Sequence, residues 1–312
     1  MIKALLPLLL GAALAGAAGA CKTPHLAPGL CDANQDLLAD PPTDRRQWLD
    51  PTPLVMADVP TSDMQARAVR AEPFRRHLET ALGRPVQYFV ARDYADLLSA
   101  FHAGRVHLVN INTGSVEQEV VCAGYVPLVQ PVDDKGEAAG LRMEIVVPAH
   151  SPIQRPEELK GQTLTFVDAH SMSGFKTPRA LLAKDFGLEA GRDYRFDFSG
   201  RHDSSLMGVV SGLYAAAAVS SKVRRDLERA RLVEPQDLRV IYSSALFLHS
   251  PWGVSHRLNP ELALRLQQAM QSYVGPADAL PSGARFRPAD YRKEWAPVRR
   301  LNQALGEVPR CD

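Results

Sequence analysis

The sequence predicts an α/β protein of two lobes, each a mainly parallel sheet flanked by helices. Three observations support this prediction. The chain has 312 residues, enough for two cores of ordinary domain size. From Leu54 onward, short apolar runs alternate with amphipathic stretches, as in chains of βαβ units. Gly83 and Gly104 follow two of the amphipathic stretches, in the position of glycines that end helices.

Charge and composition indicate an ordinary globular protein. Charged residues make up 23% of the chain and the formal net charge is +1, so the sequence predicts neither a nucleic-acid-binding surface nor an acidic disordered tail. Apolar residues make up 46% and aromatic residues 7%, as in typical globular domains. We therefore expect a small-molecule partner, no nucleic acid, no cofactor and a monomer.

The first twenty residues have the pattern of an export signal. Lys3 supplies a positive charge, Leu5 to Ala18 are apolar or small, and Ala18-Gly19-Ala20 fits a cleavage site. We predict that residues 1–20 are a signal peptide and that the mature protein lies in the periplasm; a membrane anchor is the alternative. Cys21 follows directly, like the acylated cysteine of bacterial lipoproteins, but Ala18 stands where leucine is usual. Anchorage through a lipidated Cys21 stays open.

Four cysteines in an exported chain suggest a disulfide, because that compartment is oxidising. If Cys21 is lipidated or lost, three remain. Cys31 and Cys311 lie near opposite ends of the chain, and domain termini commonly lie close together. We predict that Cys31 and Cys311 pair. Cys122 is then unpaired, and we expect a buried structural thiol there.

Residues 21–53 form a leader segment rich in proline and aspartate. Part of it has the spacing of oxygen ligands in calcium loops. The candidate ligands are Asp32, Asn34, Asp36 and Asp40. Leu37, however, stands where such loops need glycine. The alternative is an acidic turn that caps Trp48 and the following strand.

The elements then follow in order. We predict that residues 54–142 form the first part of lobe 1, with strands at 54–59, 86–90, 106–110 and 125–130 and helices at 64–82, 94–102 and 114–123. We predict that residues 143–243 form lobe 2, with strands near 142–148, 163–167, 194–198, 213–219 and 238–243 and helices at 175–187, 203–212 and 222–230. Residues 244–312 return to lobe 1, with a strand at 252–256 and helices at 260–273 and 290–305.

Small polar residues follow three of the predicted strands, where open α/β sheets bind ligands. One strand is followed by Ser171-Met172-Ser173-Gly174, which places hydroxyls beside the unpaired N–H groups of a helix start, an arrangement that suits an anion. Asn112-Thr113-Gly114 follows a second strand, and His202 follows a third. Helix capping would be enough to explain the polar residues at any one of these junctions. Three junctions from two lobes favour an anion site.

These segments resemble the phosphate/phosphite/phosphonate substrate-binding proteins of ABC transporters, the PhnD-like group. The resemblance rests on Ser171-Met172-Ser173-Gly174-Phe175, on Gly200-Arg201-His202-Asp203 and on the strand spacing around Asn112-Thr113-Gly114. It implies a two-lobed periplasmic binding protein of type II, with the ligand cleft between the lobes. It also implies that Ser171, the Met172 main chain, Ser173 and His202 contact the oxyanion. Asn112, Thr113 and Ser250 complete the expected contact set.

The chain departs from the phosphonate binders of this family at two points. Ile111 stands where they carry an aromatic residue, and His249-Ser250-Pro251 stands where they carry Gly-Asp-Pro. Without the carboxylate, a small inorganic anion is favoured over 2-aminoethylphosphonate. Phosphate, phosphite and arsenic oxyanions stay open, the last because trivalent arsenic prefers thiolate and the chain has Cys122. Distance weighs against this, because Cys122 lies about eight residues beyond the helix start at Gly114, roughly 12 Å along the axis.

The expected role is capture of a small tetrahedral oxyanion for delivery to the membrane permease of an ABC transporter, without catalysis. Two alternatives remain. One is an oxyanion sensor that signals through the ectodomain of a histidine kinase. The other is a hydrolase with Ser173 as nucleophile and His202 as base, although the chain lacks the Gly-x-Ser-x-Gly elbow.

Overall fold

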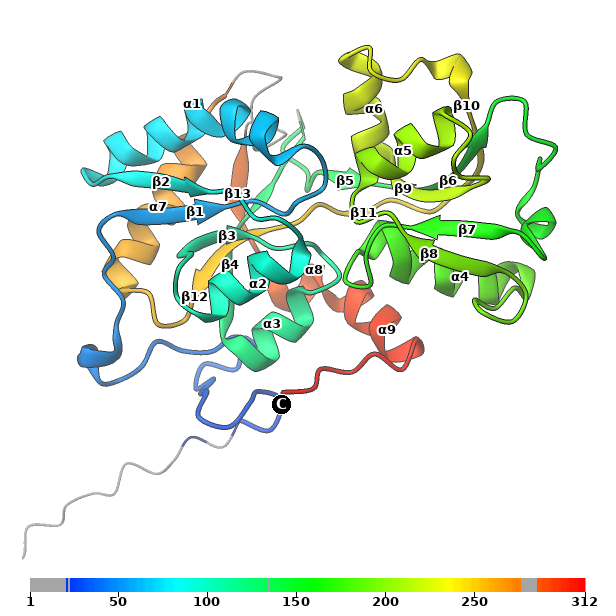
Figure 1. The fold of residues 1–312 in the computed structure, drawn as a ribbon. Helices are drawn as coiled ribbons and strands as arrows, with labels where there is room; N and C mark the ends of the chain where they lie inside the picture. Colours follow the sequence, from blue (N-terminus) through cyan, green and yellow to red (C-terminus); the bar gives the residue numbers. More distant parts are fainter. Residues whose placement is uncertain (1–20, 22, 134, 276–284, 312) are drawn as a thin grey trace, which may run out of the picture.

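The computed structural model describes residues 21, 23–133, 135–275 and 285–311. The predicted signal peptide, residues 1–20, lies outside them. The two sheets lie side by side in Figure 1, each with its own helices. The prediction of a two-lobed α/β protein is confirmed.

The sheet of lobe 1 has the strand order β13-β4-β12-β3-β1-β2. The strands are β1 (Leu54–Ala57), β2 (Val86–Phe89), β3 (Leu108–Asn110), β4 (Tyr125–Pro131), β12 (Trp252–Ser255) and β13 (Phe286–Pro288). The helices of this part of the chain are α1 (Met64–Leu82), α2 (Tyr94–His102), α3 (Val116–Ala123), α7 (Pro260–Ser272), α8 (Tyr291–Glu294) and α9 (Ala296–Ala304). Two strands from late in the chain belong to this sheet: β12 lies between β3 and β4, and β13 pairs with β4.

The sheet of lobe 2 has the strand order β10-β6-β9-β7-β8. The strands are β6 (Met143–Pro148), β7 (Thr163–Phe166), β8 (Arg195–Phe198), β9 (Ala217–Ser220) and β10 (Leu238–Ser243). Its helical elements are η3 (Met172–Lys176), which runs directly into α4 (Thr177–Phe186), then α5 (His202–Val210) and α6 (Ser221–Arg229). Short 3-10 turns are η1 (Arg45–Gln47), η2 (Pro156–Leu159) and η4 (Pro235–Asp237).

The sheets are mixed rather than mainly parallel. In lobe 1, β1 runs parallel to β2 and β3, but β12 and β13 are antiparallel to their neighbours. In lobe 2, β7 runs parallel to β8 and β9, while β6 is antiparallel to β9 and β10. A strand that enters its sheet from the other lobe does not need the right-handed βαβ crossover that keeps successive strands parallel. β12 and β6 both enter in this way.

Two chain segments join the lobes. They form a small antiparallel sheet of β5 (Gly140–Leu141) and β11 (Phe247–Leu248). The first segment carries the chain into lobe 2 and the second carries it back. Paired crossover strands of this kind give a hinge about which two lobes can close.

Apolar packing gives each lobe a core of its own. On one face of the lobe 1 sheet, Phe74 of α1 packs against Trp252 and Tyr273, with ring centroids 5.6 and 4.9 Å apart. In lobe 2, Phe166 and Phe175 meet edge to face at 5.1 Å. The rings exclude water from both sheets and fix the strand ends that form the cleft. Among the helices of the described residues, none has both the length and the apolar character of a membrane span.

The lobes touch each other in this structure. Asn112 Nδ2 donates to the His170 carbonyl at 2.6 Å, and the His202 N–H donates to the Thr61 carbonyl at 3.2 Å. Lys176 Nζ donates to the Gly114 carbonyl at 3.0 Å. Each bond joins one lobe to the other, so this conformation is closed.

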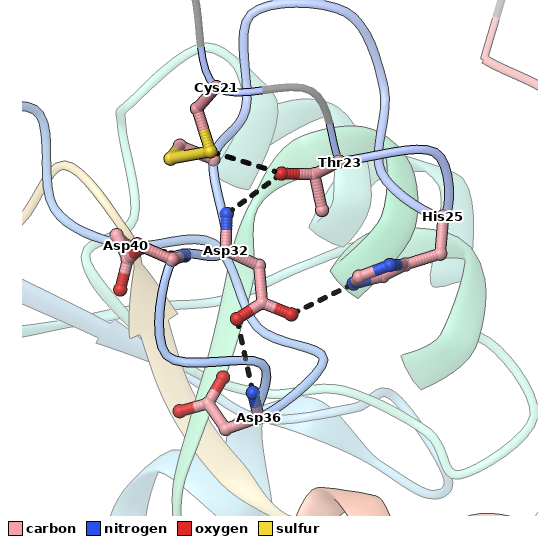
Figure 2. The surroundings of a disulfide bond; sticks show 8 residues. Cys21, Thr23, His25, Asp32, Asp36 and Asp40 are labelled. Atoms are coloured by element: carbon pink, nitrogen blue, oxygen red, sulfur yellow. Dashed lines mark hydrogen bonds and ion pairs between the residues drawn. A yellow bond between two sulfur atoms is a disulfide. The ribbon is translucent and has the colours of Figure 1, made fainter.

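All four cysteines are in disulfides, and the predicted pairing of Cys31 with Cys311 is wrong. Cys31 pairs with Cys21, as Figure 2 shows, and Cys311 pairs with Cys122. The cause lies in the path of the C-terminal tail. Gln118 on α3 holds the main chain of Arg310 by its carbonyl (2.7 Å) and its N–H (3.1 Å), which places the tail along the helix that carries Cys122.

These pairings change two further expectations. Cys122 is not a free thiol, so it offers no thiolate to trivalent arsenic. The sulfur of Cys21 cannot carry a disulfide and a lipid at the same time, and the structure shows the disulfide with Cys31.

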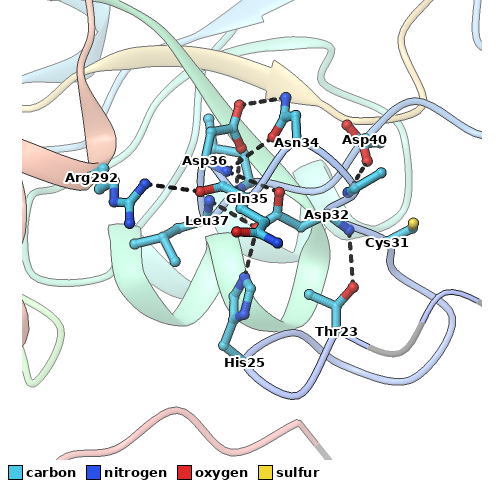
Figure 3. Close-up of polar contacts among 12 residues, drawn as sticks. Thr23, His25, Cys31, Asp32, Asn34, Gln35, Asp36, Leu37, Asp40 and Arg292 are labelled. Carbon is cyan, nitrogen blue, oxygen red and sulfur yellow. Dashed lines mark hydrogen bonds and ion pairs between the residues drawn. The ribbon is translucent and has the colours of Figure 1, made fainter.

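The calcium-loop hypothesis for the leader is also wrong. Within the described residues no group of three or more histidines, cysteines or acidic residues is arranged to hold a metal ion. The carboxylates of Asp32 and Asp40 instead accept main-chain N–H groups: Asp32 from Asp36 (3.0 Å) and Leu37 (2.9 Å), and Asp40 from Ala33 (2.6 Å) (Figure 3). Asn34 and Asp36 bond to each other at 3.0 Å. The segment is an acidic turn, and it does not cap Trp48, whose indole N–H donates to the Pro42 carbonyl at 2.7 Å.

Candidate functional site

A cavity lies between the lobes, at the strand ends where the sequence placed the anion site. About 70 Å³ of it is open to the centres of water molecules, which is room for a few waters or one small anion. All seven residues expected to contact the ligand line it: Asn112, Thr113, Ser171, Met172, Ser173, His202 and Ser250. The structure therefore brings together side chains that are up to 138 residues apart in the sequence (250 − 112).

The turn after β7 presents hydrogen-bond donors to this cavity. Ser171 precedes η3, and its Oγ accepts the N–H of Gly174 at 3.0 Å, which leaves the hydroxyl proton of Ser171 available. The N–H groups at the start of a helical run have no intrahelical acceptor. Met172 and Ser173 stand at this start, and both are buried. The turn is therefore suited to the oxygens of an anion.

His202 stands at the start of α5 and faces Ser173. Its Nε2 lies 3.5 Å from Ser173 Oγ, and its Nδ1 accepts the main-chain N–H of Ser220 at 3.1 Å. Burial lowers the pKa of His202 to about 3, so the imidazole is neutral at physiological pH. A neutral imidazole has one N–H and one acceptor nitrogen. Because Nδ1 accepts, the proton is on Nε2, and His202 is a donor toward the cavity.

This protonation state contradicts the hydrolase alternative. A general base for Ser173 would need a free lone pair on the nitrogen that faces the hydroxyl. In His202 that nitrogen carries the proton, and burial makes the ring a weak base. The pair is arranged to donate two hydrogen bonds to a common acceptor and not to activate a nucleophile.

Three of the expected contacts have other partners in this structure. Asn112 donates its amide protons to Ser115 Oγ (3.1 Å) and to the His170 carbonyl, and Thr113 donates its hydroxyl to the Leu248 carbonyl (3.1 Å). These bonds hold the lobes together and fix the hinge. Ser250 lines the cavity with its side chain, while its carbonyl accepts from Asn110 at 3.0 Å.

The cavity also contains charged residues that sequence reasoning missed. Asp58 and Arg67 form an ion pair in its lobe 1 wall, and Lys222 and Asp226 form another in its lobe 2 wall. Asp58 directly follows β1, and Lys222 stands two residues after the end of β9, so the rule used for the other strand ends could have found these two. His249, noted only as a departure from the family pattern, also lines the cavity.

His249 is neutral in this environment. Burial, together with the positive charges of Lys222 and Arg67, lowers the pKa of His249 to about 3. Its Nε2 is buried and has no hydrogen-bond partner in the part of the chain that the structure describes. When a buried polar atom beside a cavity has no hydrogen-bond partner in the protein, a ligand or water in the cavity is expected to supply the missing hydrogen bond.

Comparison with known proteins agrees with this geometry. Residues 56–293 match the family model described as the periplasmic substrate-binding protein of phosphonate ABC transporters. The phosphate-import protein PhnD of Mycolicibacterium smegmatis is 25% identical over 226 residues, which are 70% of this chain and 70% of that protein. The phosphonates-binding periplasmic protein of Escherichia coli is 24% identical over 197 residues, covering 62% of this chain and 58% of that one.

Solved structures share the fold. The binding protein component of a phosphonate ABC transporter from Pseudomonas aeruginosa has a TM-score of 0.72 at 19% identity, covering 81% of this chain and 86% of that one. PhnD1 from Prochlorococcus marinus, solved with methylphosphonate, has a TM-score of 0.70 at 18% identity, covering 82% of this chain and 98% of that one. The resemblance first seen in residues 171–175 is confirmed. The chain belongs to the periplasmic substrate-binding proteins of phosphonate ABC transporters, which are binding proteins and not enzymes.

Proposed function

We propose that this protein captures a small inorganic tetrahedral oxyanion, phosphate or phosphite, and delivers it to the permease of an ABC transporter. The observation that carries the proposal is the pair of donors made by Ser173 Oγ and His202 Nε2, both buried and 3.5 Å apart at the wall of a closed interlobe cavity. Hydroxyl and neutral imidazole N–H groups donate hydrogen bonds to an anion, and bonds to a charged acceptor are stronger than bonds to a neutral one.

The lining of the cavity favours an inorganic anion over an aminoalkylphosphonate. The two carboxylates in the wall, Asp58 and Asp226, are already paired with Arg67 and Lys222. Neither is left free to receive the ammonium group of an aminoalkylphosphonate.

Delivery follows from closure. Hydrogen bonds across the lobes, such as that from Asn112 to the His170 carbonyl, form only when the cleft shuts. An anion that contacts both lobes therefore shifts the equilibrium toward the closed form. We expect the permease to recognise that form.

A thermal-shift screen followed by calorimetry tests the proposal. The purified protein should be stabilised by phosphate or phosphite, less by methylphosphonate, and not by 2-aminoethylphosphonate. Ser173→Ala should weaken binding of the preferred anion by roughly 10- to 100-fold, because it removes a hydrogen bond to a charged group. Ser243, an exposed residue at the end of β10 in lobe 2, serves as a matched control in Ser243→Ala. No stabilisation by any tetrahedral anion would refute the proposal.

A further inference from the structure

Two ion pairs line the cavity from opposite lobes, one buried and one half-buried. Asp58 and Arg67 belong to lobe 1, with side chains 4% and 10% exposed. Lys222 and Asp226 belong to lobe 2, one turn apart on α6, with side chains 18% and 23% exposed. All four line the cavity that holds Ser173.

Arg67 has donors that the protein does not use. Its Nη2 bonds to Asp58, but its Nε is buried and has no acceptor among the described residues. The whole residue is 8% exposed. Leaving a guanidinium N–H buried without an acceptor is unfavourable unless a ligand or water supplies one. The position of Arg67 in the cavity wall makes a cavity ligand the candidate acceptor.

Lys222 supplies a second positive charge at the same cavity. Its ammonium group bonds to Asp226, which leaves further donors available. Burial lowers the pKa of Lys222, and the positive charge of Arg67 acts in the same direction. Two cations that repel each other are stabilised by an anion placed between them.

The paired carboxylates explain why the empty cavity tolerates these cations. Asp58 and Asp226 neutralise them in the absence of ligand, so the closed cavity carries no net charge from the four side chains. Discrimination between anions therefore depends on which groups face the ligand and not on net charge. The unused Nε–H of Arg67 and the remaining ammonium protons of Lys222 are charged donors, and a charged donor attracts a dianion more strongly than a monoanion.

We propose that Arg67 and Lys222 are specificity-determining residues, which contact the bound oxyanion from opposite lobes and select a dianion over a monoanion. This inference rests on the proposed function, since it assigns the charge state of the anion held by Ser173 and His202. The class of ligand is therefore a doubly charged tetrahedral oxyanion, such as phosphite or hydrogenphosphate.

The test compares phosphite, a dianion at pH 8, with hypophosphite, which carries one charge. Calorimetry gives the ratio of the affinity for phosphite to the affinity for hypophosphite, for the wild type and for three variants. Lys222→Met with Asp226→Asn removes the ammonium group while keeping the pair neutral, and it should lower the ratio at least about tenfold. Asp226→Asn alone frees the ammonium group and should raise the ratio. Lys184→Met, on the exposed side of α4, controls for the loss of a remote positive charge and should leave the ratio unchanged.

Arg67→Met with Asp58→Asn applies the same test to lobe 1, with circular dichroism to show that the variant is folded. A wild-type ratio in both neutral double variants would overturn the inference. The proposed function would survive that result if Ser173→Ala still weakened phosphite binding. If the wild type bound neither anion, the proposed function itself would fail, so the two failures are distinguishable.

Discussion

Gly114 lies where the two lobes come closest, and replacing it with alanine tests the closure mechanism. A Cβ on Gly114 would lie 2.6 Å from the His170 carbonyl oxygen and 3.1 Å from the Met172 nitrogen, both in lobe 2. The first distance is too short for a carbon, so the lobes would have to separate by roughly half an ångström. The backbone of Gly114 is outside the left-handed region, so alanine fits the open form without strain.

The expected magnitude follows from the contacts at this position. Separation would weaken the bond from Asn112 to the His170 carbonyl (2.6 Å) and the bond from Lys176 to the Gly114 carbonyl (3.0 Å). A neutral hydrogen bond contributes about 1 kcal/mol and one to a charged group about 1.5–3 kcal/mol. Closure of the variant should therefore be less favourable by roughly 2–4 kcal/mol, and its affinity for phosphate weaker by roughly 30- to 1000-fold.

Two measurements separate closure from folding. Calorimetry should show the loss of phosphate affinity, while the melting temperature without ligand should stay within a degree or two of the wild type. Gly114→Ser, with a larger side chain, should lose at least as much affinity as Gly114→Ala. Wild-type affinity in Gly114→Ala would refute the closed geometry, and an equal loss of stability without ligand would show that Gly114 is needed for folding instead.

Three further predictions follow from the described contacts. Glu307→Gln removes a carboxylate that pairs with Lys176 of lobe 2 at 2.8 Å, so phosphate affinity by calorimetry should fall about two- to fivefold; an unchanged value would show that the pair does not favour closure. Cys122→Ser with Cys311→Ser opens a link with a sequence separation of 189 and should lower the free energy of unfolding by about 3–5 kcal/mol in urea denaturation, whereas unchanged stability would contradict the pairing. His202 has a folded-state pKa of about 3 against an ordinary 6.5, so between these pH values the unfolded chain binds more protons than the folded one. The contribution of His202 to the free energy of unfolding is therefore fully present above about pH 6.5 and is lost as the pH falls toward 3. His202→Asn should flatten the acid loss of stability in that window, and an unaltered pH profile would place the protonation change elsewhere.

The strand-end rule explains why much of the site was predictable. Ser171, Ser173 and His202 each follow a strand by a few residues, and strand ends from both lobes meet at the cleft. Small polar residues at such positions therefore mark a ligand site even without knowledge of the pairing of strands. The role of His202 as donor was not predictable, because it depends on the main-chain N–H of Ser220 that its Nδ1 accepts.

Other features depend on contacts that leave no local pattern. Arg67 stands on a helix with several other charged residues, where a charge usually faces solvent. The pairing of Cys122 with Cys311 depends on the course of the C-terminal tail along α3, which Gln118 determines through two main-chain bonds. The mixed sheets depend on the direction from which β12 enters lobe 1.

A crystal structure of the protein grown with phosphite would examine the proposed site most directly. We expect the anion to occupy the interlobe cavity, with one oxygen within hydrogen-bond distance of Ser173 Oγ and His202 Nε2 and with both lobes closed around it. An anion bound elsewhere, or one held by a single lobe with the cleft open, would contradict the account.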